Sequence, residues 1–321
     1  MVGKICGTGS YAPTLVWDND KLSEMVDTSD EWIRERTGIV RRHVISGRED
    51  AVYMAQRAAQ DALKNANVDA KDIDLILVAT MSAERIMPCT ACEVQSKIGA
   101  DRATCFDLNA ACTGFLYALN TAQAYLGQEI YHTAVVIGVE SLSNQLNWKD
   151  RSTCILFGDG AGAVVLRSQE QGRYAQITRC DGSRGEALTC SSRNQIRFEE
   201  DPKNDTTYMQ MNGGQVFKFA VSKVPVVIRE LLKQEKMSAD AIDYYILHQA
   251  NERIVRLVAK RLKQDMDKFP MNMEEYGNTS SASIPILLDE LNKKETFHDG
   301  DFLVISGFGG GLTYGASLIE W

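Results

Sequence analysis

Two stretches of this chain, about half its length apart, follow one pattern. Residues 52–80 (VYMAQRAAQDALKNANVDAKDIDLILVAT) and 224–250 (VPVVIRELLKQEKMSADAIDYYILHQA) each suggest a helix, a short polar turn, Ile-Asp and a strand. Each half then closes with a glycine-rich turn and a strand, FGDGAGAVVL (157–166) and GGGLTYGASLI (309–319). A repeat of this kind indicates two copies of one α/β unit fused in a single chain.

The apolar pattern gives the fold class. Continuous Val/Ile/Leu runs separated by helical patterns indicate sheets that helices bury on both faces. The halves are predicted to be residues 1–170, which carry a candidate nucleophilic cysteine, and 171–321, with an insertion near 141–157 in the first. Strands are predicted at 2–6, 74–80, 103–107, 134–140, 161–167, 242–247, 302–307 and 315–320. Helices are predicted at 29–36, 50–66, 89–98, 112–126, 213–235, 250–263 and 280–292, and the polar stretch 191–208 is interpreted as a surface excursion.

Composition excludes several classes of protein. The 321 residues carry a net charge of −8, which argues against general nucleic-acid binding. The start, MVGKICGTGSYAP, lacks the apolar core of a signal peptide, and no apolar run is long enough for a membrane span. We therefore expect a cytoplasmic protein. Its eight cysteines are not expected to form a disulfide framework, and most should be small buried apolar residues.

The repeat brings three reactive residues together. Cys112 follows Asp74 at nearly the spacing at which Asn278 follows Asp243, so the two positions are roughly equivalent. His248 occupies the position at which the first half has an alanine. A pseudo-twofold axis between the halves would place the Cys112 and Asn278 turns at the centre, with His248 beside them.

Cys112 lies in RATCFDLNAACTGFLYAL, where a strand runs through a turn of small residues into a helix. A thiol at a helix N-terminus faces unpaired N–H groups and the positive end of the dipole. Both favour the thiolate, so we expect the pKa of Cys112 to be lowered. The alternative is an inert buried cysteine.

His248 ends an apolar strand, where α/β sheets place their active sites. His43, beside two arginines, is expected to be solvated. Asn278, in YGNTSSASIP, is either a helix N-cap or the third member of a Cys-His-Asn set. The segment GFGGGLTYG (307–315) offers backbone N–H groups suited to an oxyanion site, or is simply a tight strand connection.

Two charged surfaces are further candidates. Thr28 and Glu31 resemble a capping pair for the helix at 29–36, whose Trp32 and Arg36 share one face and could clamp a purine and a phosphate. In the helix after His248, Arg253, Arg256 and Lys260 share a face that could dock an acidic partner. The alternative for both surfaces is a helix face that is exposed to solvent and binds nothing.

Three motifs do not predict binding sites. GTGSYA (7–12) and GDGAGA (158–163) mimic phosphate-binding loops, but no helix is expected to follow either of them. CTAC (89–92) has no second Cys/His pair nearby, so zinc is not expected.

Taken together, these motifs are similar to the thiolase superfamily, and the chain resembles its β-ketoacyl-acyl-carrier-protein synthase III family, which initiates bacterial type II fatty-acid synthesis. Cys-His-Asn separates this branch from the elongating ketosynthases, which use Cys-His-His. The resemblance covers essentially the whole chain. It is carried by DTSDEWIRERTGI (27–39), NAACTGF (109–115), FGDGAGAVVL (157–166), MNGGQVFK (211–218), HQAN (248–251), GNTSSASIP (277–285) and GFGGGLTYG (307–315).

The resemblance implies a five-layered αβαβα fold, a homodimer and no metal or redox cofactor. It implies that Cys112 takes an acyl group from an acyl-CoA and passes it to malonyl-acyl-carrier protein as CO₂ leaves. His248 and Asn278 would stabilise the enolate, and the N–H groups of Cys112 and Gly310 would form the oxyanion hole. By the same resemblance, coenzyme A would contact Thr28, Trp32, Arg36, Arg151, Gly213, Phe217 and Asn251, with Trp32 and Arg151 on either side of the adenine.

The remaining implied sites are a primer pocket and a docking surface. The pocket would use Leu142, Phe157, Leu188 and Met87, the last from the partner subunit, and the flexible methionine suggests that it admits primers larger than acetyl. The acidic carrier protein would meet Lys218, Arg253, Lys260 and Arg261.

Three other functions stay open at this point: a ketosynthase-like acyltransferase of secondary metabolism, a Cys-His-Asn hydrolase or protease, and a non-catalytic acyl-binding or scaffold protein. The duplicated α/β halves disfavour the hydrolase. The intact Cys112, His248 and Asn278 disfavour the scaffold.

Overall fold

The computed structural model describes residues 1–191 and 208–321, so the predicted surface excursion at 191–208 lies almost wholly outside the described residues. The first sheet has five strands in the order β1-β7-β6-β4-β5. Strand β4 is parallel to its neighbours β5 and β6, whereas β7 is antiparallel to both of its neighbours. These strands are β1 (Val2–Tyr11), β4 (Leu75–Ala79), β5 (Thr104–Leu108), β6 (Thr133–Glu140) and β7 (Gly160–Gln169).

The second sheet repeats this arrangement with four strands in the order β11-β12-β13-β8. β11 is parallel to β12, and β13 is antiparallel to β12 and β8. These strands are β8 (Tyr174–Cys180), β11 (Tyr244–Leu247), β12 (Phe302–Gly309) and β13 (Thr313–Glu320). The proposed boundary between the halves, at residues 170 and 171, falls in the connection between β7 and β8.

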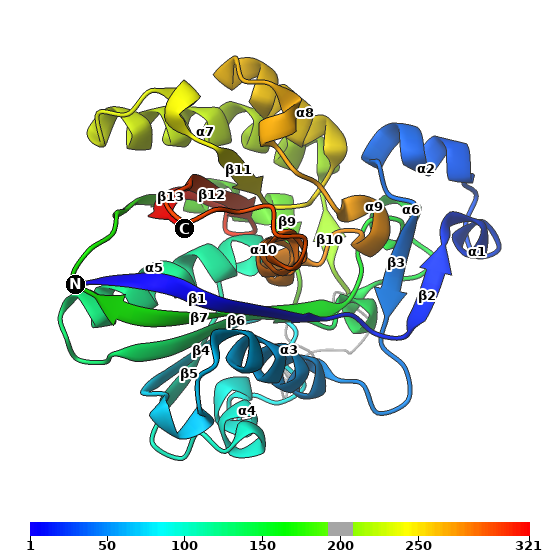
Figure 1. Ribbon diagram of the computed structural model, residues 1–321. Helices are drawn as coiled ribbons and strands as arrows, with labels where there is room; N and C mark the ends of the chain where they lie inside the picture. The colour runs from blue at the N-terminus through cyan, green and yellow to red at the C-terminus, as the bar shows by residue number, and fades with distance from the viewer. Residues whose placement is uncertain (192–207) are drawn as a thin grey trace.

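Helices and sheets alternate in five layers (Figure 1). One outer layer is α3 (Ala51–Ala66) with α4 (Thr90–Ile98), and the other is α7 (Gly213–Gln234) with α8 (Glu252–Leu262). Between the sheets lie α5 (Gly114–Gly127) and α10 (Ser283–Lys293), whose apolar side chains form one core with strands of both sheets. The expected αβαβα architecture with two duplicated halves is confirmed. Strand β6 shows the reason for its apolar sequence, since all of its residues are buried.

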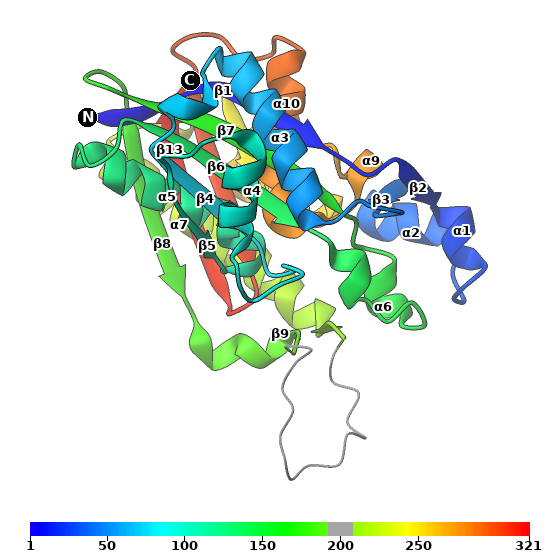
Figure 2. The same ribbon diagram turned by 90° about the horizontal axis from the view of Figure 1, so that it is seen from below.

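A smaller unit packs at one end of these layers, with α1, α2 and α6 together in both views (Figures 1 and 2). A separate apolar cluster holds it, with Leu22 and Ile33 packed against Cys154 and Ile155. It contains the hairpin of β2 (Leu15–Asp18) and β3 (Arg41–Val44), and the helices α1 (Asn19–Ser23), α2 (Asp30–Thr37) and α6 (Arg151–Cys154). The predicted insertion near 141–157 supplies α6.

The expectation of a solvated His43 is wrong. Its ring stacks on Tyr276 and its Nδ1 lies 2.6 Å from the Pro13 carbonyl oxygen. Neighbouring Arg42 is fully buried, and its guanidinium donates to the Ile155 carbonyl and the Asn19 side chain. Arg42 therefore ties β3 to α1 and the end of α6, whereas His43 ties it to Pro13 and Tyr276.

The predicted strands and long helices are all present, with ends shifted by up to five residues, the most at the end of β1. Sequence analysis missed β8, an edge strand whose alternating polar residues face solvent. It also missed short elements that tertiary contacts fix: α9 (Met273–Tyr276), β9 (Leu188–Thr189) and β10 (Gln210–Met211). The two glycine motifs lead into or lie in strands rather than open helices, as predicted. Over the described ranges, no helix has the length and apolarity that crossing a membrane requires.

Candidate active site

The Cys112 turn joins β5 to α5. Cys112 is the middle residue of a 3₁₀ turn, Ala111–Thr113, and is 94% buried at the N-terminal end of α5. Ala111 has a left-handed backbone (φ 47°), a conformation that costs an alanine about 1–2 kcal/mol and bends the chain sharply. Gly309 packs against this turn so closely that a Cβ there would lie 2.8 Å from the Cys112 nitrogen. The glycine-rich segment therefore holds the cysteine in place.

The second half contains a matching turn, but not where the sequence comparison put it. Asn278 Oδ1 accepts from the Ser280 N–H (2.9 Å), just as Asn109 Oδ1 accepts from the Ala111 N–H (3.2 Å). Ser280 is also left-handed (φ 49°), like Ala111. The structural counterpart of Asn278 is thus Asn109 rather than Cys112. The expected equivalence was wrong by three residues, which makes Ser281 the counterpart of Cys112.

The turn that follows Asn278 connects all three candidate catalytic residues. Ser280 lines the same cavity as Cys112 and lowers the pKa of its thiol, while its backbone N–H donates to Asn278. Ser283, at the start of α10, lies 2.7 Å from His248 Nδ1. No direct hydrogen bond joins Cys112 to His248 or Asn278 in the described chain. The predicted meeting of the two turns is nevertheless real, with His248 beside them.

Hydrogen bonds fix the orientation of His248. The Ser283 hydroxyl accepts from the Gln249 backbone N–H (3.3 Å), so its own proton is available to donate to His248 Nδ1. When the Ser283 hydroxyl donates to Nδ1, the ring proton lies on Nε2. Burial lowers the pKa of His248 to about 3, and the ring packs edge-on against Phe308. His248 is therefore a neutral donor at physiological pH.

The expectation of a lowered pKa for Cys112 is wrong. Burial raises it to about 12, and the charge of Glu140 raises it further, although bonds from Ser280 and the Cys112 backbone act in the opposite direction. The dipole of a helix contributes about 1 kcal/mol, which is less than the cost of burying a thiolate. Burial therefore favours the thiol form of Cys112.

A cavity of about 40 Å³ lies directly beside the Cys112 side chain. Phe157, Leu188 and Gly310 line it, as expected for the primer pocket and oxyanion hole. Leu142 is fully buried and packs in the same apolar cluster. Sequence analysis missed Met81 and Met209, two methionines that also line this cavity.

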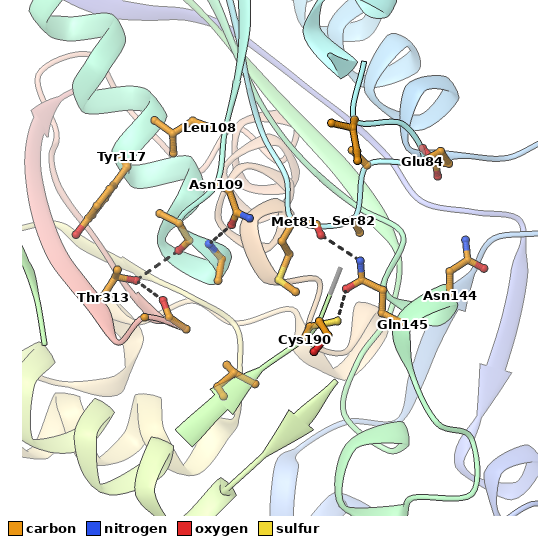
Figure 3. Close-up of a pocket in the computed structure, with 18 of the residues that line it drawn as sticks. Met81, Ser82, Glu84, Leu108, Asn109, Tyr117, Asn144, Gln145, Cys190 and Thr313 are labelled. Carbon is orange, nitrogen blue, oxygen red and sulfur yellow. Dashed lines mark hydrogen bonds between the residues drawn. The ribbon is translucent and has the colours of Figure 1, made fainter. Parts of the chain in front are cut away.

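A larger cavity of about 870 Å³ opens next to it (Figure 3). The Gln145 side chain lies in the wall of this cavity. Its amide N–H donates to the Met81 carbonyl, and its Oε1 lies 3.5 Å from the Cys190 sulfur. Ile86 lines the cavity, but Met87 is 84% exposed and lines neither cavity of its own chain. A single chain therefore does not place Met87 in the primer pocket.

A cleft of about 530 Å³ separates the small unit from α7 and α8. It brings together most of the residues expected to bind coenzyme A: Trp32, Arg36, Arg151, Gly213, Phe217 and Asn251. The guanidinium carbons of Arg36 and Arg151 lie 5.4 and 5.0 Å from the Trp32 ring centre. Among the described residues, four cations and no carboxylate line this cleft, so it suits a ligand that carries phosphates.

Two of these residues differ from expectation in detail. The N-cap of α2 is Ser29, whose hydroxyl accepts from the Trp32 N–H, so the proposed Thr28–Glu31 cap is wrong. The Thr28 hydroxyl is consequently buried without a hydrogen-bond partner in the described structure, which leaves it available to a ligand. The Asn251 amide instead ties α8 to α2, donating to the Arg36 carbonyl and accepting from the Arg253 N–H.

Two of the four expected docking residues line this cleft, and the other two lie farther along α8. Lys218 and Arg253 line the cleft, and Arg253 lies over the Phe217 ring at 5.6 Å. Lys260 and Arg261 are exposed at the other end of α8, where Arg261 also donates to the Val221 carbonyl. Arg256 is paired with Glu252 and offers less free charge.

Two further groups are the buried carboxylate Glu140 and a pair of cysteines at the start of α4. Glu140, which sequence analysis did not single out, ends β6 and is fully buried between the two turns. The sulfurs of Cys89 and Cys92 lie 3.4 Å apart at the start of α4. Within residues 1–191 and 208–321, no cluster of three or more metal-ligating side chains is present.

Comparisons with known proteins agree with this geometry. Residues 106–182 match the family 3-oxoacyl-[acyl-carrier-protein] synthase III, and residues 232–321 match the C-terminal region of the same family. The chain is 47% identical over 320 residues to a β-ketoacyl-[acyl-carrier-protein] synthase III of Clostridium botulinum (strain Okra / Type B1), covering 99% of this chain and 98% of the relative. It is 46% identical over 323 residues to the enzyme of that name from Clostridium novyi (strain NT), with the same coverage.

Solved structures show the same fold. The 3-oxoacyl-[acyl-carrier-protein] synthase III of Aquifex aeolicus VF5 matches with a TM-score of 0.93 and 40% identity, over 99% of this chain and 100% of that one. The priming β-ketosynthase of the R1128 polyketide pathway matches with a TM-score of 0.94 and 33% identity, over 99% and 96%.

Proposed function

The chain belongs to the 3-oxoacyl-[acyl-carrier-protein] synthase III family, and on that premise we propose which of its residues perform each step. Its reaction is the decarboxylative condensation of an acyl-CoA primer with malonyl-acyl-carrier protein, which initiates fatty-acid synthesis. The curated relatives at 46–47% identity carry this activity in their names, which favours it over the secondary-metabolism alternative.

In the first half-reaction Cys112 attacks the thioester carbonyl of the acyl-CoA. The backbone N–H groups of Cys112 and Gly310 hold the oxyanion, and the acyl chain enters the cavity lined by Phe157 and Leu188. Coenzyme A lies in the cationic cleft, its adenine between Trp32 and Arg151. Because those side chains already lie against each other, the guanidinium must swing away to admit the base.

In the second half-reaction the malonyl thioester loses CO₂ while its carbonyl oxygen becomes an enolate oxygen. His248 Nε2–H and the Asn278 amide N–H donate to that oxygen. The hydrogen bonds of His248 to Ser283 and of Asn278 Oδ1 to the Ser280 N–H leave these donors pointing at substrate. The enolate carbon then attacks acyl-Cys112. No metal or redox cofactor takes part in the proposed steps.

We also propose a homodimer. Ile86 and Met87 are 79% and 84% exposed on a loop beside an open cavity of about 870 Å³, an unusual exposure for two large apolar side chains. In the dimer, the partner subunit's Met87 would close the primer pocket. Its flexibility suits primers larger than acetyl.

The observation that carries the proposal is the convergence of Cys112, His248 and Asn278 on one turn between two duplicated halves. The test is product analysis with acyl-CoA and malonyl-acyl-carrier protein. We expect equal amounts of CO₂ and β-ketoacyl-carrier protein, with neither formed when one substrate is omitted. Free acid without condensation would support a hydrolase instead.

The basic face of α8 should control the encounter with the carrier protein. Lys260→Glu is expected to lower kcat/KM for malonyl-acyl-carrier protein about tenfold at low salt, because charges at the rim mainly set the association rate. The loss should shrink in high salt, where exposed charges are screened. Steady-state kinetics at several ionic strengths would measure both effects.

The control is Lys97→Glu, the same charge change on α4 in the opposite outer layer. Equal losses in the two variants, or a loss that salt does not relieve, would show that the carrier protein does not dock on α8.

A further inference from the structure

The cavity beside Cys112 is small, and a much larger one adjoins it. The first has a volume of about 40 Å³ and the second about 870 Å³. A water molecule occupies ~30 Å³ of liquid, so the first cavity takes the methyl group of an acetyl but not a long acyl chain. The partition between the two cavities consists of the described residues that line both: Met81, Ala111, Leu188, Cys190 and Gly310. A longer primer must pass this partition.

Gln145 contacts the partition from the side of the larger cavity (Figure 3). Its Nε2–H donates to the Met81 carbonyl (3.1 Å), and the Cys190 thiol donates to its Oε1 (3.5 Å). One amide therefore joins the chain that follows β4 to the chain that follows β9. Because a thiol is a weak donor, the bond to Met81 holds the partition more strongly than the bond from Cys190.

The backbone of Gln145 holds a further residue of the small cavity. Its carbonyl accepts from the Met209 N–H (2.9 Å), and Met209 is buried in the lining of that cavity. Met81 is also fixed from its other side, since its own N–H donates to the buried Glu140 (3.1 Å). Gln145 thus positions three residues that surround the acyl group on Cys112.

The turn that carries Gln145 is itself anchored. It is the 3₁₀ turn Leu142–Gln145, which directly follows β6. The Ser141 N–H donates to Ser82 Oγ (2.8 Å), and the Ser143 N–H donates to Asp159 Oδ1 (2.8 Å). A side chain on an anchored turn restrains the partition instead of moving with it.

We propose that Gln145 limits the length of the primer, as a positioning residue that keeps the partition closed at Met81 and Cys190. This inference rests on the proposed function, in which Cys112 carries the acyl group. Primers slightly larger than acetyl fit when the flexible side chains of Met81 and Met209 rearrange. A chain of about eight carbons requires the partition to open, so the site selects short-chain acyl thioesters.

Loss of the Gln145 side-chain bonds should join the two cavities. The Met81 carbonyl then loses its amide donor, and the Cys190 thiol loses the acceptor that Gln145 provides. The lining of the larger cavity includes the apolar side chains of Met81 and Ile86, which suit a hydrocarbon chain. In the proposed dimer the partner subunit's Met87 would border this space, and its flexible side chain can yield to an acyl chain.

The test compares the primer preference of wild type with that of Gln145→Ala, Gln145→Met and Asn144→Ala. The readouts are kcat/KM for condensation with acetyl-, isobutyryl- and octanoyl-CoA, and acylation of Cys112 followed by intact mass. Gln145→Met keeps most of the side-chain volume but removes both side-chain bonds. Asn144→Ala is the matched control, because it removes an amide from the same turn and the same larger cavity, and that amide bonds neither Met81 nor Cys190 in the described structure.

Wild type should use acetyl-CoA and isobutyryl-CoA and react poorly with octanoyl-CoA. Both Gln145 variants should raise the ratio of kcat/KM for octanoyl-CoA to that for acetyl-CoA about tenfold or more, because a single methylene in an apolar pocket changes kcat/KM by about that factor. Asn144→Ala should keep the wild-type ratio. A merely structural role for Gln145 would lower kcat/KM for every primer together and leave the ratio unchanged.

An unchanged ratio in Gln145→Met would overturn the proposal, even if Gln145→Ala raises it, because Gln145 would then act through its volume and not through its hydrogen bonds. An equal rise in Asn144→Ala, or ready use of octanoyl-CoA by wild type, would overturn it as well. In each of these cases Cys112 is still acylated by acetyl-CoA and the proposed function stands. If the proposed function is wrong, no acyl-CoA acylates Cys112 in any of the four proteins, and the inference fails with it.

Discussion

Replacement of Cys112 by alanine should abolish condensation, lowering kcat/KM by about 10⁴-fold or more. The acyl group must be bound to the Cys112 sulfur before the carbon–carbon bond forms, and among the described residues Cys190 is the one other thiol that lines the cavity beside it. Formation of β-ketoacyl-carrier protein, measured by mass, is the readout. The fold should survive, since the change removes one sulfur atom at a cost of about 1 kcal/mol.

A matched control removes a thiol from the strand that leads into the same turn. Cys105→Ala, on β5, should retain the activity of wild type. Appreciable condensation by Cys112→Ala, or an equal loss in Cys105→Ala, would contradict the assignment of the nucleophile.

His248→Ala and Asn278→Asp should separate the two half-reactions. Each removes an N–H donor to the enolate oxygen, so decarboxylation should fall about 10²–10³-fold while Cys112 still becomes acylated. The asparagine variant is nearly isosteric and places a carboxyl where the amide donor stood. Release of CO₂ from malonyl-acyl-carrier protein, measured after pre-acylation, isolates this step.

The pH dependence of the second half-reaction follows from the burial of His248. A histidine whose folded-state pKa is lowered to about 3 stays neutral as pH falls, until pH approaches that value. The CO₂-release step should therefore show no histidine limb between about pH 5 and pH 8. A limb near pH 6.5 that disappears in His248→Ala would contradict the neutral-donor assignment.

The repeat in the sequence predicted the architecture and the centre of the site, but not the alignment of the two turns. Cys112 and Asn278 were matched roughly, at 38 and 35 residues after Asp74 and Asp243, and this three-residue difference is the offset that the structure shows. In the structure the equivalent residues are those with the same backbone geometry. The left-handed Ala111 of the first turn therefore corresponds to the left-handed Ser280 of the second.

The electrostatics of the site depend on burial, which the sequence pattern described only in part. Placing Cys112 at a helix N-terminus was right, but full burial outweighs the dipole and reverses the direction of its pKa shift. Glu140 left a signal that could have been used, since it is an acidic residue closing the apolar run AVVIGVE. A carboxylate at the end of a strand buried on both faces must have hydrogen-bond donors nearby.

Two other features could not be predicted from the sequence. One depends on a contact with a second chain, and the other depends on the orientation of a single side chain. The exposed Met87 can enter a primer pocket only from a second copy. The N-cap of α2 depends on which of two adjacent hydroxyls, on Thr28 or Ser29, turns toward the helix, and the sequence allows both.

The central claim is that an acyl group rests on Cys112 between two distinct half-reactions. Intact-mass spectrometry of the protein with a panel of acyl-CoAs, followed by malonyl-acyl-carrier protein, tests it most directly. We predict a mass gain that maps to Cys112, is absent in Cys112→Ala, and is discharged as β-ketoacyl-carrier protein with loss of CO₂. The primer that reacts best would also measure the pocket, and acetyl-CoA as the sole substrate would refute the larger-primer proposal. Acylation discharged only to water, or no gain on Cys112, would contradict the account.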